Sequence, residues 1–179
     1  DGKGDEFKNG VKIFDVGVAK NRFYRIFFNT LKIYKIAIKQ NVEVYHFHDP
    51  ELLLISWMLK LFSSSEIIYD VHENVKKDIL GKVWLPLYSR KIIAFLFVLI
   101  EKLALKFIDY IIIAEDSYFE NYKNRNNVVP VRNYPIIGLR NKNITIKNIK
   151  DDPQVNILYV GGVTKIRGAI ELIESLNFL

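Results

Sequence analysis

The chain has 179 residues, half of them hydrophobic and 13% aromatic, which suffices for a folded core and excludes an intrinsically disordered chain. It contains no cysteine, so disulfides and thiolate metal sites are excluded. The formal net charge of +6 favours anionic partners such as a phosphorylated substrate, a nucleic acid or an acidic membrane surface, without choosing among them.

Hydrophobic patterns of strands and helices follow one another through the first third of the chain. Residues 11–16 alternate like a strand, and residues 22–40 place apolar side chains three and four apart, as one face of a helix does. Residues 42–47 form a short β-branched run that predicts a second strand. Asp49 and Pro50 then suit the N-cap and the first position of a following helix.

The alternation of strands and helices continues beyond this point. Strands alternating with helices predict an α/β fold with a parallel sheet, and strands this apolar are expected to be covered on both faces. The short strand over 128–131 contains Pro130 and is therefore expected at a sheet edge. The other predicted elements are strands over 66–71, 110–114 and 156–160, helices over 90–108, over 117–123 and from 169 onward, and a linker over 132–153.

All three histidines lie where two of these apolar strands end. His46 and His48 belong to the segment 45–51, and His72 follows the strand over 66–71. Because open α/β sheets bind ligands at the carboxyl ends of their strands, we expect a site there. His46 is interpreted as a structural histidine with one satisfied ring nitrogen, and for His48 a structural and a cleft-lining role both remain open. His72 is the strongest candidate, able to donate a hydrogen bond to a substrate hydroxyl or phosphate oxygen.

Metal binding and nucleic-acid binding are both disfavoured by the sequence. His46 and His48 could contribute to a zinc site, but two histidines on one short strand are a weak signal and the sequence shows no third convergent ligand. The basic residues are dispersed rather than striped, and no known nucleic-acid-binding motif is recognisable. We therefore expect neither a metal nor a nucleic-acid partner.

The predicted helix over 90–108 is apolar on more than one face. Its longest apolar run, 92–100, falls far short of the roughly 20 residues that cross a bilayer, so no transmembrane helix is predicted. Either the helix is buried in a larger protein, which is the favoured interpretation, or its basic flanks bring it to an anionic membrane surface. One apolar stripe of this helix consists of Ile92, Leu96, Leu99, Leu103 and Phe107, and further apolar side chains lie partly off it.

Gly161 and Gly162 lie between a predicted strand and a predicted helix, and Arg167 follows them. Glycines let the backbone approach a ligand, and an arginine fork suits a diphosphate. The pattern is also that of a common turn, and it matches neither the dinucleotide fingerprint nor the P-loop.

Four blocks of sequence follow one another along the chain: HFHDPELL at 46–53, IIYDVHE at 67–73, VVPVRNYP at 128–135 and ILYVGGVTKIRG at 157–168. In this order they resemble glycosyltransferase family 4. The members of this family are enzymes of the GT-B fold, mostly retaining, that use nucleotide-activated sugars. The resemblance covers about residues 10–179, and the four blocks are specific together rather than singly.

The resemblance implies a Rossmann-like parallel sheet followed by the first strand–helix unit of a second Rossmann-like domain. It divides the chain into an incomplete acceptor-side domain over 1–131, a linker over 132–153, and the start of a donor-binding domain over 154–179. The implied function is sugar transfer from a UDP- or GDP-linked donor to a glycan or lipid-linked acceptor. Such enzymes assemble cell-surface polysaccharides, capsule or lipopolysaccharide, in the cytoplasm or on the inner face of the membrane, and no metal or other cofactor is implied.

The same resemblance sorts the candidate site residues into three groups. It implies His72 as the active-site histidine that contacts the donor sugar, His48, Glu51 and Glu73 on the acceptor side, and Gly161, Gly162 and Arg167 as the donor diphosphate site.

The chain also departs from the family pattern. Many members carry a basic residue where Gly162 stands and Lys-Gly where this chain has Arg167-Gly168, so Arg167 would have to supply most of the positive charge. The resemblance implies further strands before Asp1, and after Leu179 a larger second domain with paired glutamates. We therefore expect a fragment truncated at both ends and inactive alone. The alternatives are a nucleotide-sugar epimerase of the same fold and an inactive interaction or membrane-docking module.

Overall fold

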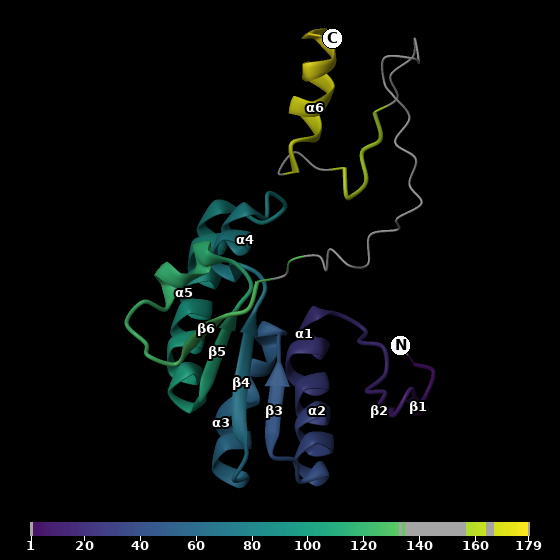
Figure 1. Cartoon of the computed structure of the whole chain (residues 1–179), viewed down its shortest axis with the longest axis vertical. Coiled ribbons are helices and arrows are strands. Elements are labelled where there is room, and N and C mark those ends of the chain that lie inside the picture. The colour runs from purple at the N-terminus through teal and green to yellow at the C-terminus, as the bar shows by residue number, and fades with distance from the viewer. Residues whose placement is uncertain (1, 133, 135–156, 164–166, 179) are drawn as a thin grey trace. The chain divides into compact units, whose positions relative to one another are not determined.

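The computed structural model describes residues 2–132, 134, 157–163 and 167–178 (Figure 1). The chain divides into two units, Asp1–Pro135 and Ile136–Leu179, and each is described by itself. Nearly all of the linker predicted over 132–153 lies outside the described residues.

A four-stranded parallel sheet in the order β3-β4-β5-β6 lies at the centre of the first unit (Figure 1). Strands that are neighbours in the sheet are also consecutive in the sequence, and all of them run parallel. The α/β fold with a parallel sheet that the sequence predicted is therefore confirmed. The strand with Pro130 lies at one edge of the sheet, as expected. The strands are β3 (Val44–Phe47), β4 (Glu66–Val71), β5 (Tyr110–Ile113) and β6 (Val128–Pro130).

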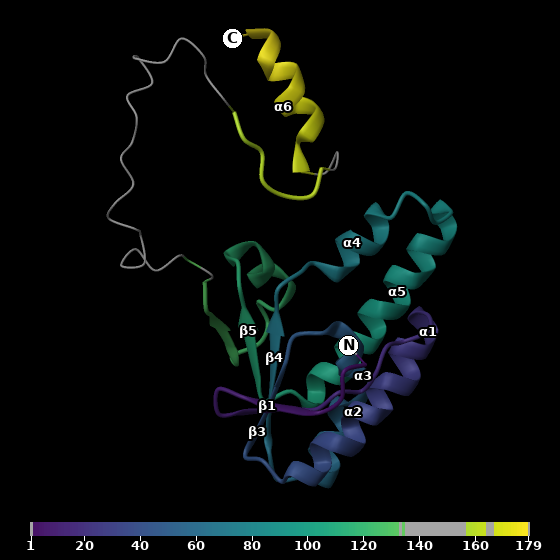
Figure 2. The same cartoon turned by 90° about the vertical axis from the view of Figure 1, so that its right-hand side faces the viewer.

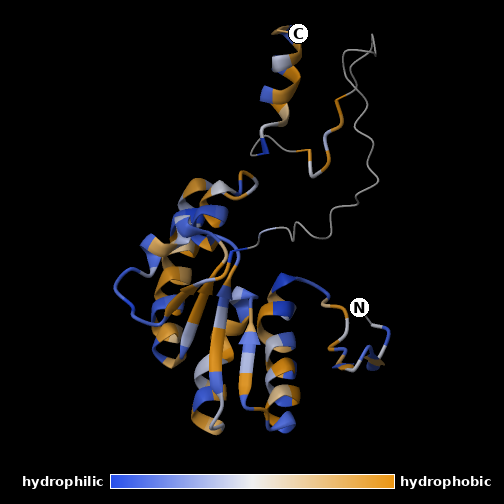
Figure 3. Ribbon diagram, in the orientation of Figure 1, coloured by the Kyte–Doolittle hydropathy of each residue, from blue (hydrophilic) through white to orange (hydrophobic). Residues whose placement is uncertain are grey.

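Three helices lie on the same side of this sheet, as Figure 2 shows: α2 (Thr30–Ala37), α3 (Leu53–Phe62) and α5 (Leu87–Ala104). The core forms where they meet the sheet, and hydrophobic residues run along the strands and the helices (Figure 3). Its fully buried side chains include Tyr69 and Ile111 from the strands.

The opposite face of the sheet is exposed or half-exposed in the described residues. Burial alternates along β3, β4 and β5, so every second side chain turns away from the helices. The expectation that both faces are covered is therefore wrong for the described part of the chain. The uncovered face carries the polar side chains of His46, Asp70 and Tyr110 beside Ile68 and Ile112, which accounts for its tolerance of water.

The helix predicted over 22–40 is confirmed, with a change of winding inside it. It consists of α1 (Arg22–Tyr24), a π-helical stretch (Arg25–Asn29), α2 and a 3₁₀ turn (Ile38–Gln40). At its start, the Asn21 side chain accepts a hydrogen bond of 2.8 Å from the backbone N–H of Tyr24.

The strand predicted over 11–16 lies outside the parallel sheet. It forms β2 (Val11–Ile13), which pairs antiparallel with β1 (Glu6–Lys8). Asn9 and Gly10 connect them with φ angles of 52° and 82°. Positive φ at both central residues is what a type I′ hairpin turn requires, and Asn-Gly is its preferred sequence.

Two short elements differ from the sequence prediction. The polar stretch after Glu73 forms helix α4 (Val75–Gly81), which the sequence analysis missed, and the Asn74 side chain caps it by accepting from the Lys77 N–H at 3.1 Å. The helix predicted over 117–123 is a 3₁₀ helix (Asp116–Asn121).

Helix α5 packs against the core with only part of its apolar surface. Its inward side chains are Ala94, Phe97 and Ala104, spaced as one helical face, whereas Ile92 and Leu103 of the apolar stripe are 56% and 51% exposed. Alanine lets the helix approach the sheet closely. On a helix with apolar residues all around, periodicity alone cannot select the packed face.

The second unit contains helix α6 (Ala169–Ser175), which confirms the helix predicted from residue 169. The strand predicted over 156–160 is wrong for residues 157–160, which have no strand conformation. A strand needs a neighbour for its backbone hydrogen bonds, and none pairs with these residues in the described parts of the unit.

Candidate functional site

The three histidines of the chain gather at the carboxyl ends of β3 and β4. His46 belongs to β3, His48 follows that strand, and His72 follows β4. The rings of His48 and His72 meet edge-on, with their centroids 6.0 Å apart. Two parallel neighbouring strands end side by side, so residues 24 positions apart in sequence are brought together.

Asp70 is the residue that joins this cluster. Its Oδ2 atom accepts a hydrogen bond of 3.2 Å from Nε2 of His46 and lies 3.1 Å from Nε2 of His72. The Asp70 side chain is only 16% exposed, while the two imidazoles are about half exposed. His46 thus has the single ring partner that its interpretation as a structural histidine requires.

The sequence analysis did not single out Asp70. It was treated as part of the apolar strand, although the strand period of two places it on the same face as His72. That shared face was the available signal, and it would have indicated a carboxylate beside the histidine.

Tyr118 holds the main chain at His72. Its hydroxyl donates a hydrogen bond of 3.1 Å to the backbone carbonyl of His72. Burial raises the pKa of the Tyr118 phenol, and the neighbouring Glu115 carboxylate adds to the rise, so the hydroxyl keeps its proton at neutral pH. Tyr118 follows β5, so residues from three consecutive strand ends contribute to this edge of the sheet.

Asp49 does not cap a helix with its side chain, contrary to the prediction. It precedes a 3₁₀ turn (Pro50–Leu52), and its carboxylate makes no capping hydrogen bond there. The backbone carbonyl of Asp49 accepts from the Leu52 N–H at 3.0 Å instead, because a 3₁₀ turn closes through its main chain.

Glu51 and Glu73 line a groove of about 1030 Å³ in the first unit. Arg25 forms an ion pair with Glu51 at this groove. The other walls are largely apolar and include Trp84, Leu96 and Ile100. No histidine is among the described side chains that line the groove. The three residues predicted on the acceptor side therefore lie in two places: the two glutamates line the groove, and His48 lies in the histidine cluster.

Gly161, Gly162 and Arg167 belong to the second unit. Gly161 has a φ of 146°, a conformation that favours glycine, and a Cβ atom there would lie 3.7 Å from Nη1 of Arg167. The Tyr159 hydroxyl donates to the carbonyl of Gly162 at 3.1 Å. The guanidinium of Arg167 therefore lies beside the glycine backbone, within the segment that the sequence analysis selected.

The cluster can perform acid–base or hydrogen-bond chemistry. An imidazole with one nitrogen directed at a carboxylate has its other nitrogen available to a ligand.

Within the described ranges, no group of three or more acidic or histidine side chains is arranged to hold a metal ion. In the same ranges, every helix is too short or too polar to cross a membrane. No family model, curated protein or solved structure matches the chain.

Proposed function

We propose that this chain is the acceptor-side part of a GT-B glycosyltransferase, followed by the start of its donor-binding domain. The reaction is transfer of a sugar, with retention, from a UDP- or GDP-linked donor to a glycan or lipid-linked acceptor of a cell-surface polysaccharide. The observation that carries the proposal is His72 at the carboxyl end of β4, with its ring backed by Asp70 at 3.1 Å. A polar cluster at that edge of a parallel sheet is where this kind of enzyme needs its substrate.

The chemistry of sugar transfer fits the groups present. A nucleoside diphosphate leaving group needs cationic and N–H stabilisation rather than a strong acid. Arg167, beside the backbone of Gly161, supports a role for this segment in binding the diphosphate. His72 then contacts a hydroxyl of the donor sugar, and no step of this scheme calls for a metal ion.

The groove that Glu51 and Glu73 line supports an acceptor-binding role. Its volume of about 1030 Å³ is at the upper end of small-molecule sites, and its walls are mostly apolar with a few charged groups. A lipid-linked acceptor has the same combination of an apolar chain and a polar head. His48 lies beside His72, where the acceptor hydroxyl must reach the donor sugar.

Turnover of nucleotide sugars tests the proposal. The protein should be expressed from the complete reading frame that contains this sequence, because the donor-binding residues are expected largely outside it. With a panel of UDP- and GDP-sugars we expect release of a nucleoside diphosphate, accelerated by a lipid-linked or glycan acceptor. A changed sugar nucleotide formed without acceptor would indicate an epimerase instead, and no turnover of any donor would contradict both.

The outward face of α5 favours a second role, docking to an anionic membrane surface. Lys91, Phe95, Leu99 and Lys102 follow one another at three- and four-residue steps, so they share one face of the helix. All four are exposed, and Phe95 is 68% exposed. Lysines interleaved with large apolar side chains are typical of helices that lie in the membrane interface. This role is compatible with a lipid-linked acceptor and with a location on the inner face of the membrane.

Liposome co-sedimentation tests the docking role. We expect binding to vesicles that contain anionic lipid, and Lys102→Glu should weaken it. Lys39→Glu makes the same charge change at an exposed position away from α5 and serves as the matched control. Equal sedimentation of the two variants, or no dependence on anionic lipid, would contradict the docking role and leave the glycosyltransferase proposal untouched.

A further inference from the structure

We infer that Asp70 is a positioning residue for His72, which it holds in the tautomer that presents Nδ1 to a substrate hydroxyl as a hydrogen-bond acceptor. The substrate part of this statement rests on the proposed function, whereas the tautomer does not. The sequence suggested that neutral His72 donates a hydrogen bond to the substrate. The geometry reverses that role, because Nε2 of His72 lies 3.1 Å from a carboxylate oxygen of Asp70, which has no proton to donate.

The shared oxygen of Asp70 is the first argument. Oδ2 lies 3.2 Å from Nε2 of His46 and 3.1 Å from Nε2 of His72, so one carboxylate oxygen faces two imidazoles. His46 makes a hydrogen bond to this oxygen, and His72 contacts it at ion-pair distance. A carboxylate oxygen carries only lone pairs, so a neutral ring whose Nε2 atom lies this close to it is stable only with its proton on Nε2. The lone pair of each neutral ring is then on Nδ1.

The rigidity of the support is the second argument. Asp70 lies in β4, which pairs with β3 on one side and with β5 on the other, and it stands opposite Ile112 in the register. Its side chain is 16% exposed. The main chain of His72 is held separately by the Tyr118 hydroxyl at 3.1 Å. The ring of His72 is therefore restrained both at its Nε2 atom and at its backbone.

The free nitrogen of His72 is the third argument. In the part of the chain that the structure describes, no hydrogen bond reaches Nδ1 of His72, and the side chain is 48% exposed. A carboxylate behind an imidazole fixes the tautomer and strengthens the opposite nitrogen as a base, which is the arrangement that catalytic histidines use. Nδ1 is thus prepared to accept a hydrogen bond from a sugar hydroxyl.

Nitrogen-15 NMR of the histidine rings tests this inference on the 179-residue chain without any ligand. At about pH 9 imidazoles are neutral, and long-range proton–nitrogen spectra distinguish the two tautomers. We expect His46 and His72 to show a single Nε2–H tautomer. In Asp70→Ala both should change to a mixture, whereas His48, which makes neither a hydrogen bond nor an ion pair with Asp70 in the described structure, should keep its spectrum.

The inference is overturned if His72 carries its proton on Nδ1, or if Asp70→Ala leaves the His72 spectrum unchanged. The wild-type spectrum alone decides the first point. Should Asp70→Ala fail to fold, Asp70→Leu keeps the shape of the side chain and removes both acceptor oxygens. His46 and His72 should then both lose their fixed tautomer, and an unchanged His72 spectrum overturns the inference.

Activity separates this inference from the proposed function. In the protein from the complete reading frame, we expect Asp70→Asn to lower kcat on the order of tenfold or more with little change in the KM for the donor. Fixed tautomers together with no turnover of any nucleotide sugar would sink the proposed function and leave the positioning role standing. Turnover together with a His72 tautomer independent of Asp70 would do the reverse.

Discussion

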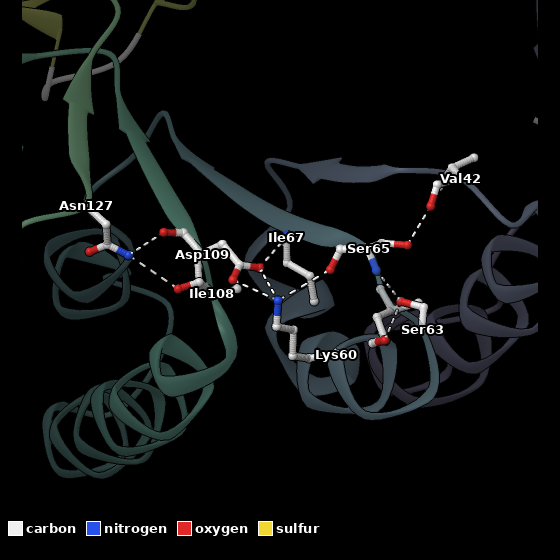
Figure 4. Close-up of polar contacts among 9 residues, drawn as sticks. Val42, Lys60, Ser63, Ser65, Ile67, Ile108, Asp109 and Asn127 are labelled. Atoms are coloured by element: carbon white, nitrogen blue, oxygen red, sulfur yellow. Dashed lines mark hydrogen bonds and ion pairs between the residues drawn. The ribbon is translucent and has the colours of Figure 1, made fainter.

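The amino ends and the carboxyl ends of the parallel strands carry polar clusters of opposite character, and we call these two ends of the sheet the amino edge and the carboxyl edge. At the amino edge, Nζ of Lys60 lies 2.7 Å from each carboxylate oxygen of Asp109, and one of these oxygens accepts the backbone N–H of Ile67 at 2.8 Å (Figure 4). At the carboxyl edge, His46 and His72 share one oxygen of Asp70 and are half exposed. The amino edge directs its polar atoms at one another, and the carboxyl edge leaves ring nitrogens available.

The amino-edge network extends across the whole sheet. Asn127, just before β6, donates to the carbonyls of Ile108 and Asp109 at 3.3 and 2.6 Å (Figure 4). The Ser65 hydroxyl donates to the carbonyl of Val42, just before β3, at 2.5 Å. These side chains bridge the starts of successive strands, where the ladder hydrogen bonds have not yet begun. The difference between the edges indicates that one end of the sheet holds the fold and the other is available for chemistry.

Removing Asp109 should have the largest effect on stability. Asp109→Ala leaves the Ile67 N–H without its acceptor and the Lys60 ammonium with only the Ser65 carbonyl at 3.4 Å, and we expect a loss of about 2–4 kcal/mol in the free energy of unfolding. Urea denaturation measures it. The control is Asp116→Ala, which removes an exposed ion pair with Arg132 and should cost less than about 0.5 kcal/mol. Equal losses in the two variants would mean that the amino edge is no structural network.

Asn127→Ala should have an intermediate effect. The variant removes both hydrogen bonds from the side-chain amide to the β5 entry, and we expect a loss of about 1–2 kcal/mol by the same denaturation measurement. Asn126→Ala is a suitable control, because it makes the same substitution at the neighbouring exposed position, outside the hydrogen-bond network. If Asn127→Ala lowered the free energy of unfolding by less than Asn126→Ala does, Asn127 would not belong to the stabilising network, which would then consist of Lys60 and Asp109.

Glu101 tests whether a structural carboxyl must be charged. It accepts a hydrogen bond of 2.8 Å from the Tyr122 hydroxyl beneath the sheet, and burial raises the pKa of the Glu101 carboxyl, an effect that the Tyr122 bond partly offsets. The folded chain therefore holds this proton more tightly than the unfolded chain does. Stability should rise as the pH falls through the window between the unfolded and the folded pKa, and decline as the pH rises through it.

The variant Glu101→Gln keeps an acceptor for Tyr122 but cannot ionise. Its free energy of unfolding should lack the decline that Glu101 contributes in the wild type over the pH range above the ordinary glutamate pKa of 4.5. Denaturation across that range measures the difference, with the exposed Glu120→Gln as control. A wild-type decline that survives in Glu101→Gln would assign it to other groups.

Histidine substitutions at the carboxyl edge should have the smallest effect on stability. His72→Ala and His48→Ala remove exposed side chains, so we expect each to change the free energy of unfolding by less than about 0.5 kcal/mol. A loss comparable to that of Asp109→Ala would mean that both edges are structural, and it would remove the contrast between them.

The sequence predicted the strands of the sheet and the convergence of the histidines, because both depend on local patterns: apolar runs and the residues that end them. It did not predict the pair of Lys60 and Asp109, since two residues 49 positions apart show no relation before the sheet is assembled. The packed face of α5 was not predictable, because the helix is apolar on several faces and two small alanines share the inward face with Phe97. Asp70 lies inside an apolar strand, and only the strand period of two that it shares with His72 connects it with the site.

The most direct measurement compares turnover and stability in one variant. The protein from the complete reading frame should be assayed for release of nucleoside diphosphate from its preferred sugar donor, as wild type and as His72→Ala, with urea denaturation of both. We predict that turnover falls on the order of a hundredfold or more while the free energy of unfolding stays unchanged. Turnover equal to that of the wild type would contradict the assignment of the carboxyl edge as the chemical site.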